Sequence, residues 1–219
     1  MSKIIKFFLD LIFPVYCLGC KKEGDWVCAD CFLELKINLD WPSQFGKSEF
    51  LSGVWAVSSR DQTLLHKILH NFKYNFVVDL GPILGDLAVK FLQTEKNKNP
   101  NLYFDFVVAV PLSKKRKLWR GFNQAEIIAK SISQKFNWPQ NQALVYRQYH
   151  TRPQVGLNAK DRQLNVKGIF SAKDPGLLIG KKILLIDDVF TTGATMNECA
   201  KVLKKLGAKE IRGLVLTQG

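Results

Sequence analysis

Residues 182–196, KILLIDDVFTTGATM, decide the fold of this chain. The apolar run 183–186 predicts a strand that is buried on both faces, as in a parallel sheet covered by helices. Asp187 and Asp188 end this strand, and the residues after Gly193 repeat with a helical period. One side of the expected helix is apolar: Met196, Ala200, Leu203 and Leu206. The stretch therefore predicts an α/β fold in which a mostly parallel open sheet is flanked by helices.

The segment between the aspartates and the expected helix has the composition of an anion-binding loop. Gly193 and Ala194 allow successive backbone N–H groups to turn toward one point, which the dipole of the following helix also favours. Three hydroxyl groups add donors: Thr191, Thr192 and Thr195. Ligands of open α/β sheets bind beyond the carboxyl ends of the strands, where the loop and the two carboxylates coincide. Together they suit a ribose diol that carries a 5′-phosphate.

Other kinds of protein also place acidic residues at the end of a buried strand. In a P-loop ATPase such a strand binds Mg²⁺, but the G-x-x-x-x-G-K-[ST] motif occurs nowhere in this sequence. A phospho-acceptor aspartate of a receiver-type domain would not need the threonine-rich run. An ordinary strand with a polar turn stays open as an alternative, although two adjacent buried carboxylates repel each other and lose solvation.

The composition allows one substantial hydrophobic core and a small additional module, since the chain has 219 residues, of which 47% are hydrophobic. Its net charge of +13 favours polyanionic partners. Lys outnumbers Arg by 25 to 7, however, and dispersed lysines are common on solvated surfaces. Arginine binds phosphate with two parallel hydrogen bonds, so its concentration between positions 116 and 162 marks a site. Five arginines lie there: Arg116, Arg120, Arg147, Arg152 and Arg162.

Four of the five cysteines form two C-x-x-C pairs: Cys17, Cys20, Cys28 and Cys31. Four thiolates at this spacing can bind Zn²⁺ tetrahedrally, which predicts a structural zinc module. Disulfides and an iron–sulfur cluster are the alternatives. Because the chain carries no secretory signal, we expect a reducing cytoplasm, where disulfides are rare. Cys199 lies alone and is expected to pack as a small apolar residue.

The first residues, MSKIIKFFLDLIF, predict a short amphipathic helix and no transmembrane segment. Lys6 and Asp10 interrupt its apolar run, which is too short to cross a bilayer. We expect the apolar face to pack on the neighbouring module, with peripheral membrane contact as the alternative. The turn-rich segment WPSQFGKSE predicts a boundary between the zinc-binding module, residues 1–48, and a main domain, residues 49–219.

Apolar periodicity predicts further elements of the main domain. Strands are expected at residues 50–59 and 104–112, and helices at residues 63–72, 78–92 and 124–136. Residues 94–101, TEKNKNPN, are expected to form a charged linker.

Two histidines, His66 and His70, stand four residues apart, as metal ligands often do. No third ligand lies near them in the sequence. We therefore expect solvated or capping histidines.

Five basic residues follow the strand expected at residues 104–112: Lys114, Lys115, Arg116, Lys117 and Arg120. They are expected in a loop on the same side of the sheet as the two aspartates. Pyrophosphate would suit them. Single-stranded nucleic acid would suit them too, because Trp119 and Phe122 offer stacking surfaces among the cations. A solvated run of charge is the third possibility.

The segment 145–170 is long and polar, and contains Arg152 and Arg162 among its basic residues. Such segments are often functional lids or disordered, and we expect this one to fold over the edge of the sheet. A catalytic role for His150 would need an orienting partner, which the sequence does not identify.

Residues 187–195 resemble the loop of type I phosphoribosyltransferases that binds 5-phosphoribosyl 1-pyrophosphate (PRPP). The resemblance implies that Asp187 and Asp188 hold the ribose hydroxyls, and that Mg²⁺ accompanies the pyrophosphate. It also implies a set of residues around the 5′-phosphate: Val189, Thr191, Thr192, Gly193, Ala194 and Thr195.

Taken in order, the motifs of nearly the whole chain resemble the ComF family. The paired C-x-x-C motifs are followed by VPLSKKRKLWRGFNQA, by R-x-x-x-T-R-x-Q…R-x-x-N-V-x-G-x-F and by IDDVFTTGATMNECA. The third pattern falls on Arg147, Thr151, Gln154, Arg162, Asn165, Val166, Gly168 and Phe170. The family pairs a zinc module with a type I phosphoribosyltransferase domain. The resemblance implies a cytoplasmic protein that handles incoming single-stranded DNA during natural transformation.

Three functional hypotheses follow from these motifs. The first is a PRPP-binding protein of DNA uptake that also binds single-stranded DNA. The alternative is a phosphoribosyltransferase that transfers the phosphoribosyl group to a small base or amine, although the sequence identifies no pocket for that acceptor. In either case the zinc module would be free to dock a helicase or translocation partner.

Overall fold

The structure is a computed structural model that describes residues 13–38, 45–148, 166–172 and 175–219. Its helices are α2 (Ala29–Leu33), α3 (Thr63–Tyr74), α4 (Leu80–Lys98), α5 (Lys114–Arg120), α6 (Gln124–Phe136) and α8 (Ala194–Lys205), with a 3-10 turn η1 at Pro175–Leu178. Its strands are β1 (Gly53–Ser58), β2 (Phe106–Ala109), β3 (Val145–Arg147), β4 (Phe170–Ala172), β5 (Lys182–Ile186), β6 (Val189–Phe190) and β7 (Glu210–Gln218). None of these helices combines the length and apolar character needed to cross a membrane. The amphipathic helix expected at the start of the chain lies outside the described residues.

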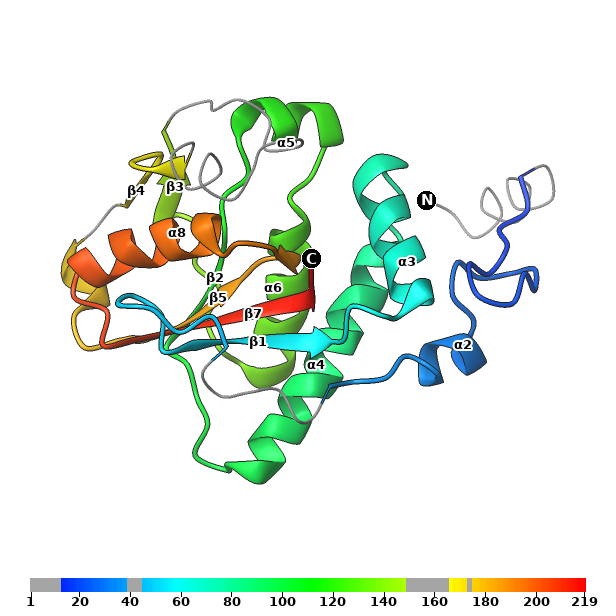
Figure 1. Cartoon of the computed structure of the whole chain (residues 1–219), viewed down its shortest axis with the longest axis horizontal. Coiled ribbons are helices and arrows are strands. Elements are labelled where there is room, and N and C mark those ends of the chain that lie inside the picture. The colour runs from blue at the N-terminus through cyan, green and yellow to red at the C-terminus, as the bar shows by residue number, and fades with distance from the viewer. Residues whose placement is uncertain (1–12, 39–44, 149–165, 173–174) are drawn as a thin grey trace.

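A parallel sheet with the strand order β1-β7-β5-β2 forms the centre of the main domain (Figure 1). The strand β5 lies between β2 and β7, so that Ile186 pairs with Ala109 on one side and with Leu214 on the other. The short strand β6 extends the pairing along the far part of β7. Every pair in this sheet is parallel, which confirms the predicted α/β class.

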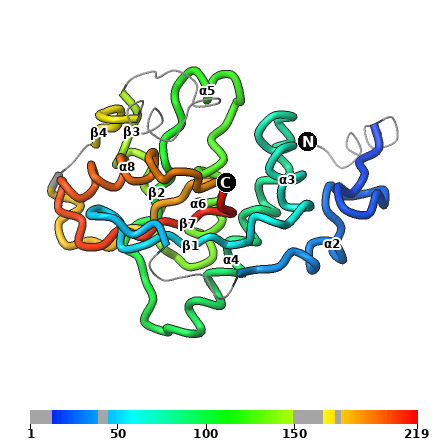
Figure 2. The backbone as a smooth tube through the Cα atoms, in the orientation of Figure 1, coloured from blue at the N-terminus to red at the C-terminus, as the bar shows by residue number. Residues whose placement is uncertain are grey.

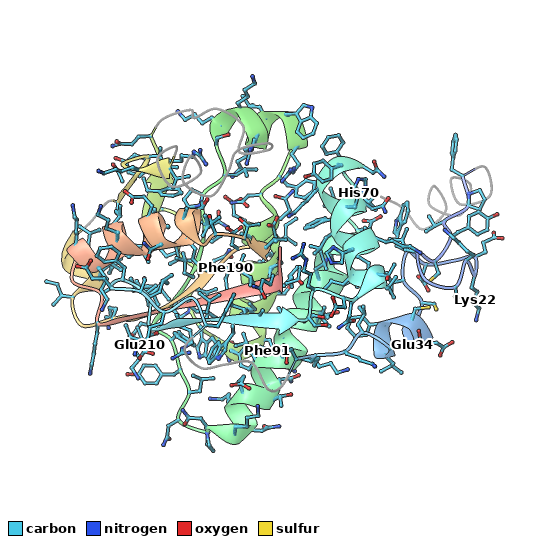
Figure 3. All side chains as sticks on the ribbon, in the orientation of Figure 1. Lys22, Glu34, His70, Phe91, Phe190 and Glu210 are labelled. Carbon is cyan, nitrogen blue, oxygen red and sulfur yellow. The ribbon has the colours of Figure 1, made fainter. Side chains whose placement is uncertain are left out.

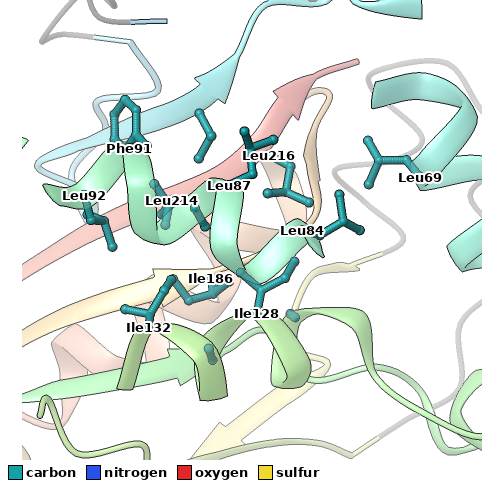
Figure 4. Close-up of a cluster of buried hydrophobic side chains, with 14 of the residues drawn as sticks. Leu69, Leu84, Leu87, Phe91, Leu92, Ile128, Ile132, Ile186, Leu214 and Leu216 are labelled. Carbon is teal, nitrogen blue, oxygen red and sulfur yellow. The ribbon is translucent and has the colours of Figure 1, made fainter. Parts of the chain in front are cut away.

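The side chains of β5 alternate between two hydrophobic cores, as the period of two in a strand requires. Leu184 and Ile186 face the core that α3, α4 and α6 cover, part of which Figure 4 shows. Ile183 and Leu185 face the core that α8 covers. All four side chains are fully buried, so the prediction of a strand buried on both faces is confirmed. Layers of helix on both faces hold the carboxyl end of β5 in a fixed place.

The central strand β7 has no counterpart in the sequence-based prediction. Its residue Gly213 sits where the sheet and α8 approach closely, because a Cβ there would lie 2.4 Å from the sulfur of Met196. The same Cβ would lie 2.9 Å from the side chain of Val54 on β1. The glycine and the charged Arg212 interrupt the apolar pattern that marks a buried strand. Glycine inside a strand often marks such a close approach.

Several predicted boundaries differ from the structure. The strand expected at residues 104–112 is the shorter β2, and the expected linker 94–101 is helical as far as Lys98. That helix end is held by an ion pair between Lys98 and Glu95 (2.9 Å) and by Lys96, which donates to backbone carbonyl groups beyond the helix. The segment 145–170, expected to be a loop, begins and ends in strands β3 and β4, which pair antiparallel.

The four-cysteine segment and α2 lie at one end of the molecule, next to α3 (Figures 1 and 2). Leu35 is buried in the same core as Leu65 of α3, and the Lys36 N–H donates to the side-chain oxygen of Gln62 (3.0 Å). The module therefore packs on the start of α3. The division of the chain at residue 48 stays a prediction.

Candidate functional site

The strand β5 brings two carboxylates to the carboxyl edge of the sheet. Asp187 still belongs to the hydrogen-bonded ladder, since its N–H donates to the Leu214 carbonyl (3.0 Å). Its carboxylate accepts from the Asp188 N–H (2.8 Å). Burial and the nearby charge of Asp188 raise the pKa of Asp187 to about 7. A carboxyl group in this state can exchange a proton near neutral pH.

The charge of Asp188 is paired with a lysine that the sequence analysis did not assign to the site. The ammonium of Lys73, on the last turn of α3, lies 2.8 Å from the Asp188 carboxylate, and both side chains are more than four-fifths buried. No motif surrounds Lys73, which is far from the aspartates in sequence. Only the packing of α3 beside the sheet brings the two charges together.

The loop after the aspartates turns sharply into α8. Gly193 has a left-handed backbone with φ of 72°, which glycine adopts at little cost. A Cβ at Gly193 would also lie 2.3 Å from the ring of Phe190, which sits beneath the loop and is labelled in Figure 3. Phe190 is itself held edge to face against Phe45 (ring centroids 5.0 Å apart). The contact with Phe190 thus fixes the loop. The first backbone N–H groups of α8, which have no partner within the helix, come directly after it.

The basic residues after β2 form a helix and not the expected loop. The Ser113 hydroxyl accepts the N–H of Arg116 (3.2 Å) and caps α5, while Gly121 ends it with φ of 81°. Residues four apart share one face of a helix, so Arg116 and Arg120 turn together toward the aspartates. The three lysines are exposed: Lys114, Lys115 and Lys117. The helix therefore divides the basic run into an arginine face toward the site and a lysine face toward solvent.

One of those lysines already has an acidic partner. The ammonium of Lys117 lies 3.0 Å from the carboxylate of Glu126 on α6.

A cavity of about 570 Å³ lies between these elements. Its walls come from the end of α3, the residues after β2, α5, the start of α6, Arg147 and the loop 187–196. One space therefore contains the two aspartates, the threonine loop and the arginine face of α5. The basic residues thus lie on the same side of the sheet as the aspartates, as predicted. Its volume lies within the range of ordinary ligand sites.

Arg147, one of the five arginines concentrated between positions 116 and 162, also lines the cavity. It ends β3, and its guanidinium lies over the ring of Phe170 (6.0 Å). Burial and the neighbouring charge of Arg116 lower the pKa of Arg147 to about 10. Four cations thus face two carboxylates in one cavity, so the site favours an anion. The four are Lys73, Arg116, Arg120 and Arg147.

Two buried N–H donors that line the cavity have no hydrogen-bond partner among the described residues. They are the Nε atom of Arg120 and the side-chain amide nitrogen of Gln124. Gln124 is only 2% exposed. Its neighbour Asn123, in contrast, caps α6 and donates to the Val110 carbonyl (3.1 Å). Buried polar groups are nearly always satisfied, so these two donors point to a ligand or water with acceptor oxygens.

The two aromatic residues of the basic motif have different environments. Trp119 is 60% exposed, but Phe122 packs on Phe72 in the core, with ring centroids 4.9 Å apart. Phe122 is half-buried, so it offers less of its ring for stacking than Trp119 does. Phe122 lies in the short segment between α5 and α6, and its ring packs on α3.

The histidines on α3 behave as expected of ordinary polar residues. The Nε2 atom of His66 lies 2.5 Å from the Arg60 carbonyl, and the ring of His70 packs on Tyr74 (5.0 Å). Within the described ranges neither belongs to a group of possible metal ligands. His150, Arg152 and Arg162 lie outside the described residues.

The four cysteines of the module lie together, as predicted. The sulfur atoms of Cys17, Cys20, Cys28 and Cys31 are all within 4.8 Å of one another, and none forms a disulfide. Burial opposes the ionisation of Cys17, but backbone N–H groups outweigh it and lower its pKa to about 6. Contact with Cys28 and burial raise the pKa of Cys31 to about 12. Four clustered thiols cannot all ionise without a cation, so this set could hold a metal ion.

Cys199, the fifth cysteine, lies on α8 and is fully buried in the core that this helix covers. This position confirms the apolar packing expected of it.

The raised pKa of Asp187 predicts a pH-dependent cost to stability. Since an ordinary Asp has a pKa near 4, the unfolded chain releases this proton at lower pH than the folded chain. The contribution of Asp187 to the free energy of unfolding is therefore greatest below about pH 4, and it is lost as the pH rises toward about 7. We expect Asp187→Asn, which keeps an acceptor for the Asp188 N–H, to raise the melting temperature more at pH 8 than at pH 5. Equal effects in thermal unfolding at both pH values would contradict the raised pKa.

Comparisons with known proteins agree with this arrangement. Residues 123–219 match the family model of the phosphoribosyl transferase domain. Competence protein F from Haemophilus influenzae is 30% identical over 199 residues, which cover 90% of this chain and 87% of that protein. Competence protein ComFC from Streptococcus pneumoniae is 30% identical over 198 residues, which cover 90% of this chain and 83% of that protein.

Among solved structures, a purine phosphoribosyltransferase from Pyrococcus horikoshii aligns with 62% of this chain and 82% of its own, at 17% identity and a TM-score of 0.39. The similarity to the two competence proteins extends over nine-tenths of this chain. This chain therefore belongs to the ComF family.

Proposed function

We propose that the protein binds PRPP together with Mg²⁺ in the cavity at the carboxyl edge of the sheet. The observation that carries this proposal is the convergence of two carboxylates, a threonine loop and four cations on one space of about 570 Å³. Asp187 and Asp188 would accept hydrogen bonds from the ribose hydroxyls. The loop from Val189 to Thr195 and the start of α8 would hold the 5′-phosphate.

The pyrophosphate of PRPP fits the opposite wall of the cavity. Arg116 and Arg120 share one face of α5, and guanidinium groups bind phosphate oxygens with two parallel hydrogen bonds. Pyrophosphate oxygens would also satisfy the unpaired donors of Arg120 and Gln124. Mg²⁺ would bind to the pyrophosphate and reduce its negative charge.

Lys73 balances part of the negative charge in the cavity. Its ammonium neutralises Asp188 at 2.8 Å, where the ribose hydroxyls would have to bind. We propose that the ribose displaces Lys73 and that the released ammonium then turns toward the phosphate oxygens.

Transfer of the phosphoribosyl group is a second candidate function, which the pKa of Asp187 favours. In such a reaction the acceptor nitrogen attacks C1 of the ribose, the bond from C1 to the pyrophosphate oxygen breaks, and the acceptor loses a proton. A buried carboxyl group with a pKa of about 7 suits a base for that proton. The acceptor would be a small base or an amine.

We propose zinc as the metal of the cysteine module. Four thiolates without an open position are the usual ligands of structural Zn²⁺, and the module packs on α3 of the main domain. The metal would stabilise the fold of the module. We propose that the module also docks a helicase or translocation partner.

We further propose that the protein acts in natural transformation in the cytoplasm and binds single-stranded DNA. The names of the two competence proteins and the net charge of +13 support this role. DNA lacks the 2′-hydroxyl, so its backbone is a poor match for the diol site between Asp187 and Asp188. We place the strand instead along the outer, lysine face of α5, where Lys114 and Lys115 are exposed.

Calorimetric titration of Mg-PRPP tests the ligand of the cavity. We expect wild-type protein to bind and Asp187→Asn/Asp188→Asn to lose at least tenfold in affinity, since hydrogen bonds to charged groups contribute about 1.5–3 kcal/mol each. Removing negative charge would by itself strengthen the binding of a polyanion, so a loss identifies contacts to the ribose hydroxyls. Asp86→Asn, an exposed position on α4, is the matched control. Equal affinity of double variant and wild type would contradict the proposal.

Elemental mass spectrometry tests the metal. One zinc ion per chain is expected in the wild type, and Cys20→Ser should lower both the zinc content and the melting temperature because it removes one ligand. Cys199→Ala, which changes a buried cysteine outside the module, should keep the zinc. A metal-free wild-type protein with disulfides between the C-x-x-C pairs would rule out the zinc module.

Fluorescence anisotropy with a labelled oligothymidylate tests the DNA surface. Lys114→Ala/Lys115→Ala should weaken binding and reduce the salt slope by about 1.4, because each phosphate contact contributes about 0.7 for single strands. The control pair Lys130→Ala/Lys135→Ala removes the same charge from exposed positions further along α6. If both pairs lower the affinity and the slope alike, net charge and not α5 is responsible.

A further inference from the structure

Two exposed aromatic side chains stand at the mouth of the cavity. Tyr74, the last residue of α3, is 49% exposed, and Trp119 on α5 is 60% exposed. Of the large hydrophobic residues that are exposed in the described parts of the chain, these two line the cavity. The two rings come from different helices, α3 and α5, and both line the same cavity.

Both rings are held in place by their neighbours. The Trp119 ring meets the ring of Phe76 edge to face, with centroids 4.9 Å apart and planes at 85°. The Tyr74 ring packs on His70 at 5.0 Å, and the Arg120 guanidinium lies 6.0 Å from its centroid. Rings fixed in this way lose little freedom when a ligand binds between them.

The residue that packs on Trp119, Phe76, has an unusual backbone conformation. Its φ of 55° places a bulky residue in the left-handed region, which is unfavourable for residues other than glycine. Such a conformation persists only where the surrounding contacts enforce it, and it is common at ligand sites. Here the turn after α3 brings the Phe76 ring against Trp119, which links α3 to α5 at the cavity mouth.

The polar groups beside the two rings indicate what kind of ligand fits. Lys73 precedes Tyr74 in the chain and pairs with Asp188, and the Arg120 guanidinium lies 6.0 Å from the centre of the Tyr74 ring. All of these residues line the same cavity. A purely apolar ligand would leave these groups without partners. A planar heterocycle would stack on the rings and present ring nitrogens and carbonyl oxygens to the charged groups.

From this arrangement we infer that Tyr74 and Trp119 form a binding subsite for a single nucleobase, beside Asp188. The inference deepens the proposed function and rests on it in one respect: the base would lie next to the ribose of PRPP. Its source is either a free nucleotide or a base within a single strand of nucleic acid. In both cases the same two rings would hold it.

The test compares an ordinary oligothymidylate with one of equal length and charge that lacks its bases. Stacking contributes about 1–3 kcal/mol per base, so Trp119→Ala and Tyr74→Ala should each weaken binding of the ordinary oligonucleotide by roughly tenfold. Binding of the abasic oligonucleotide should not change, nor should the salt slope. Trp119→Phe keeps a ring and should retain most of the affinity. Leu118→Ala, at an 85% exposed neighbour on α5, is the matched control.

Thermal unfolding of each variant separates a lost ring from a lost fold. If Trp119→Ala unfolds, Tyr74→Ala and Trp119→Phe still decide the question. Equal weakening of ordinary and abasic oligonucleotides would overturn the inference, and so would no weakening of either together with unchanged binding of nucleoside 5′-monophosphates. Nucleoside 5′-monophosphates form the second arm: sensitivity of their binding to Tyr74→Ala assigns the subsite to free nucleotides, and sensitivity of the oligonucleotide alone assigns it to a strand.

PRPP carries no base, which keeps this inference distinct from the proposed function. Mg-PRPP is titrated in parallel into the wild-type protein. Loss of base-dependent binding in the ring variants, together with no PRPP binding by the wild type, would retain the base subsite and reject the PRPP site. PRPP binding by the wild type without any base-dependent effect of the ring variants would do the opposite.

Discussion

The site depends on the burial of a carboxylate pair at the end of the central sheet. The backbone N–H of Asp187 donates to the Leu214 carbonyl of β7, and burial of its carboxyl group raises the pKa of Asp187 to about 7. Its negative charge and that of Asp188 must therefore be balanced locally, by protonation or by cations. Lys73 and the arginines of α5 provide the cations. The core around α4 and α6 holds α3 in place, because Leu65, Ile68 and Phe72 are buried in it.

The same constraint explains why the cavity favours a ligand with two different ends. The carboxylates need hydroxyl or ammonium donors, whereas Arg120 and Gln124 hold buried donors that need oxygen acceptors. A sugar with neighbouring hydroxyl groups and a pyrophosphate has both. The turn at Gly193 leads into the start of α8, where the backbone N–H groups would bind the 5′-phosphate.

Much of this arrangement could be predicted from the sequence because its signals are local. The strand before Asp187, the turn at Gly193 and the paired cysteines are each encoded within a few consecutive residues. Two features could not. The central strand β7 is masked by Gly213, whose missing side chain is explained only by the contact with Met196. Lys73 joins the site through the packing of α3, a long-range contact that leaves no pattern in one sequence.

A crystal structure of the complex with Mg-PRPP would show whether the cavity binds PRPP between its carboxylates and its arginines. We expect the 5′-phosphate at the loop around Gly193 and the ribose hydroxyls on Asp187 and Asp188, with Lys73 displaced. We also expect pyrophosphate oxygens within hydrogen-bond distance of Gln124. A structure in which PRPP binds elsewhere, or in which the ion pair of Lys73 and Asp188 persists beside an empty cavity, would contradict the account.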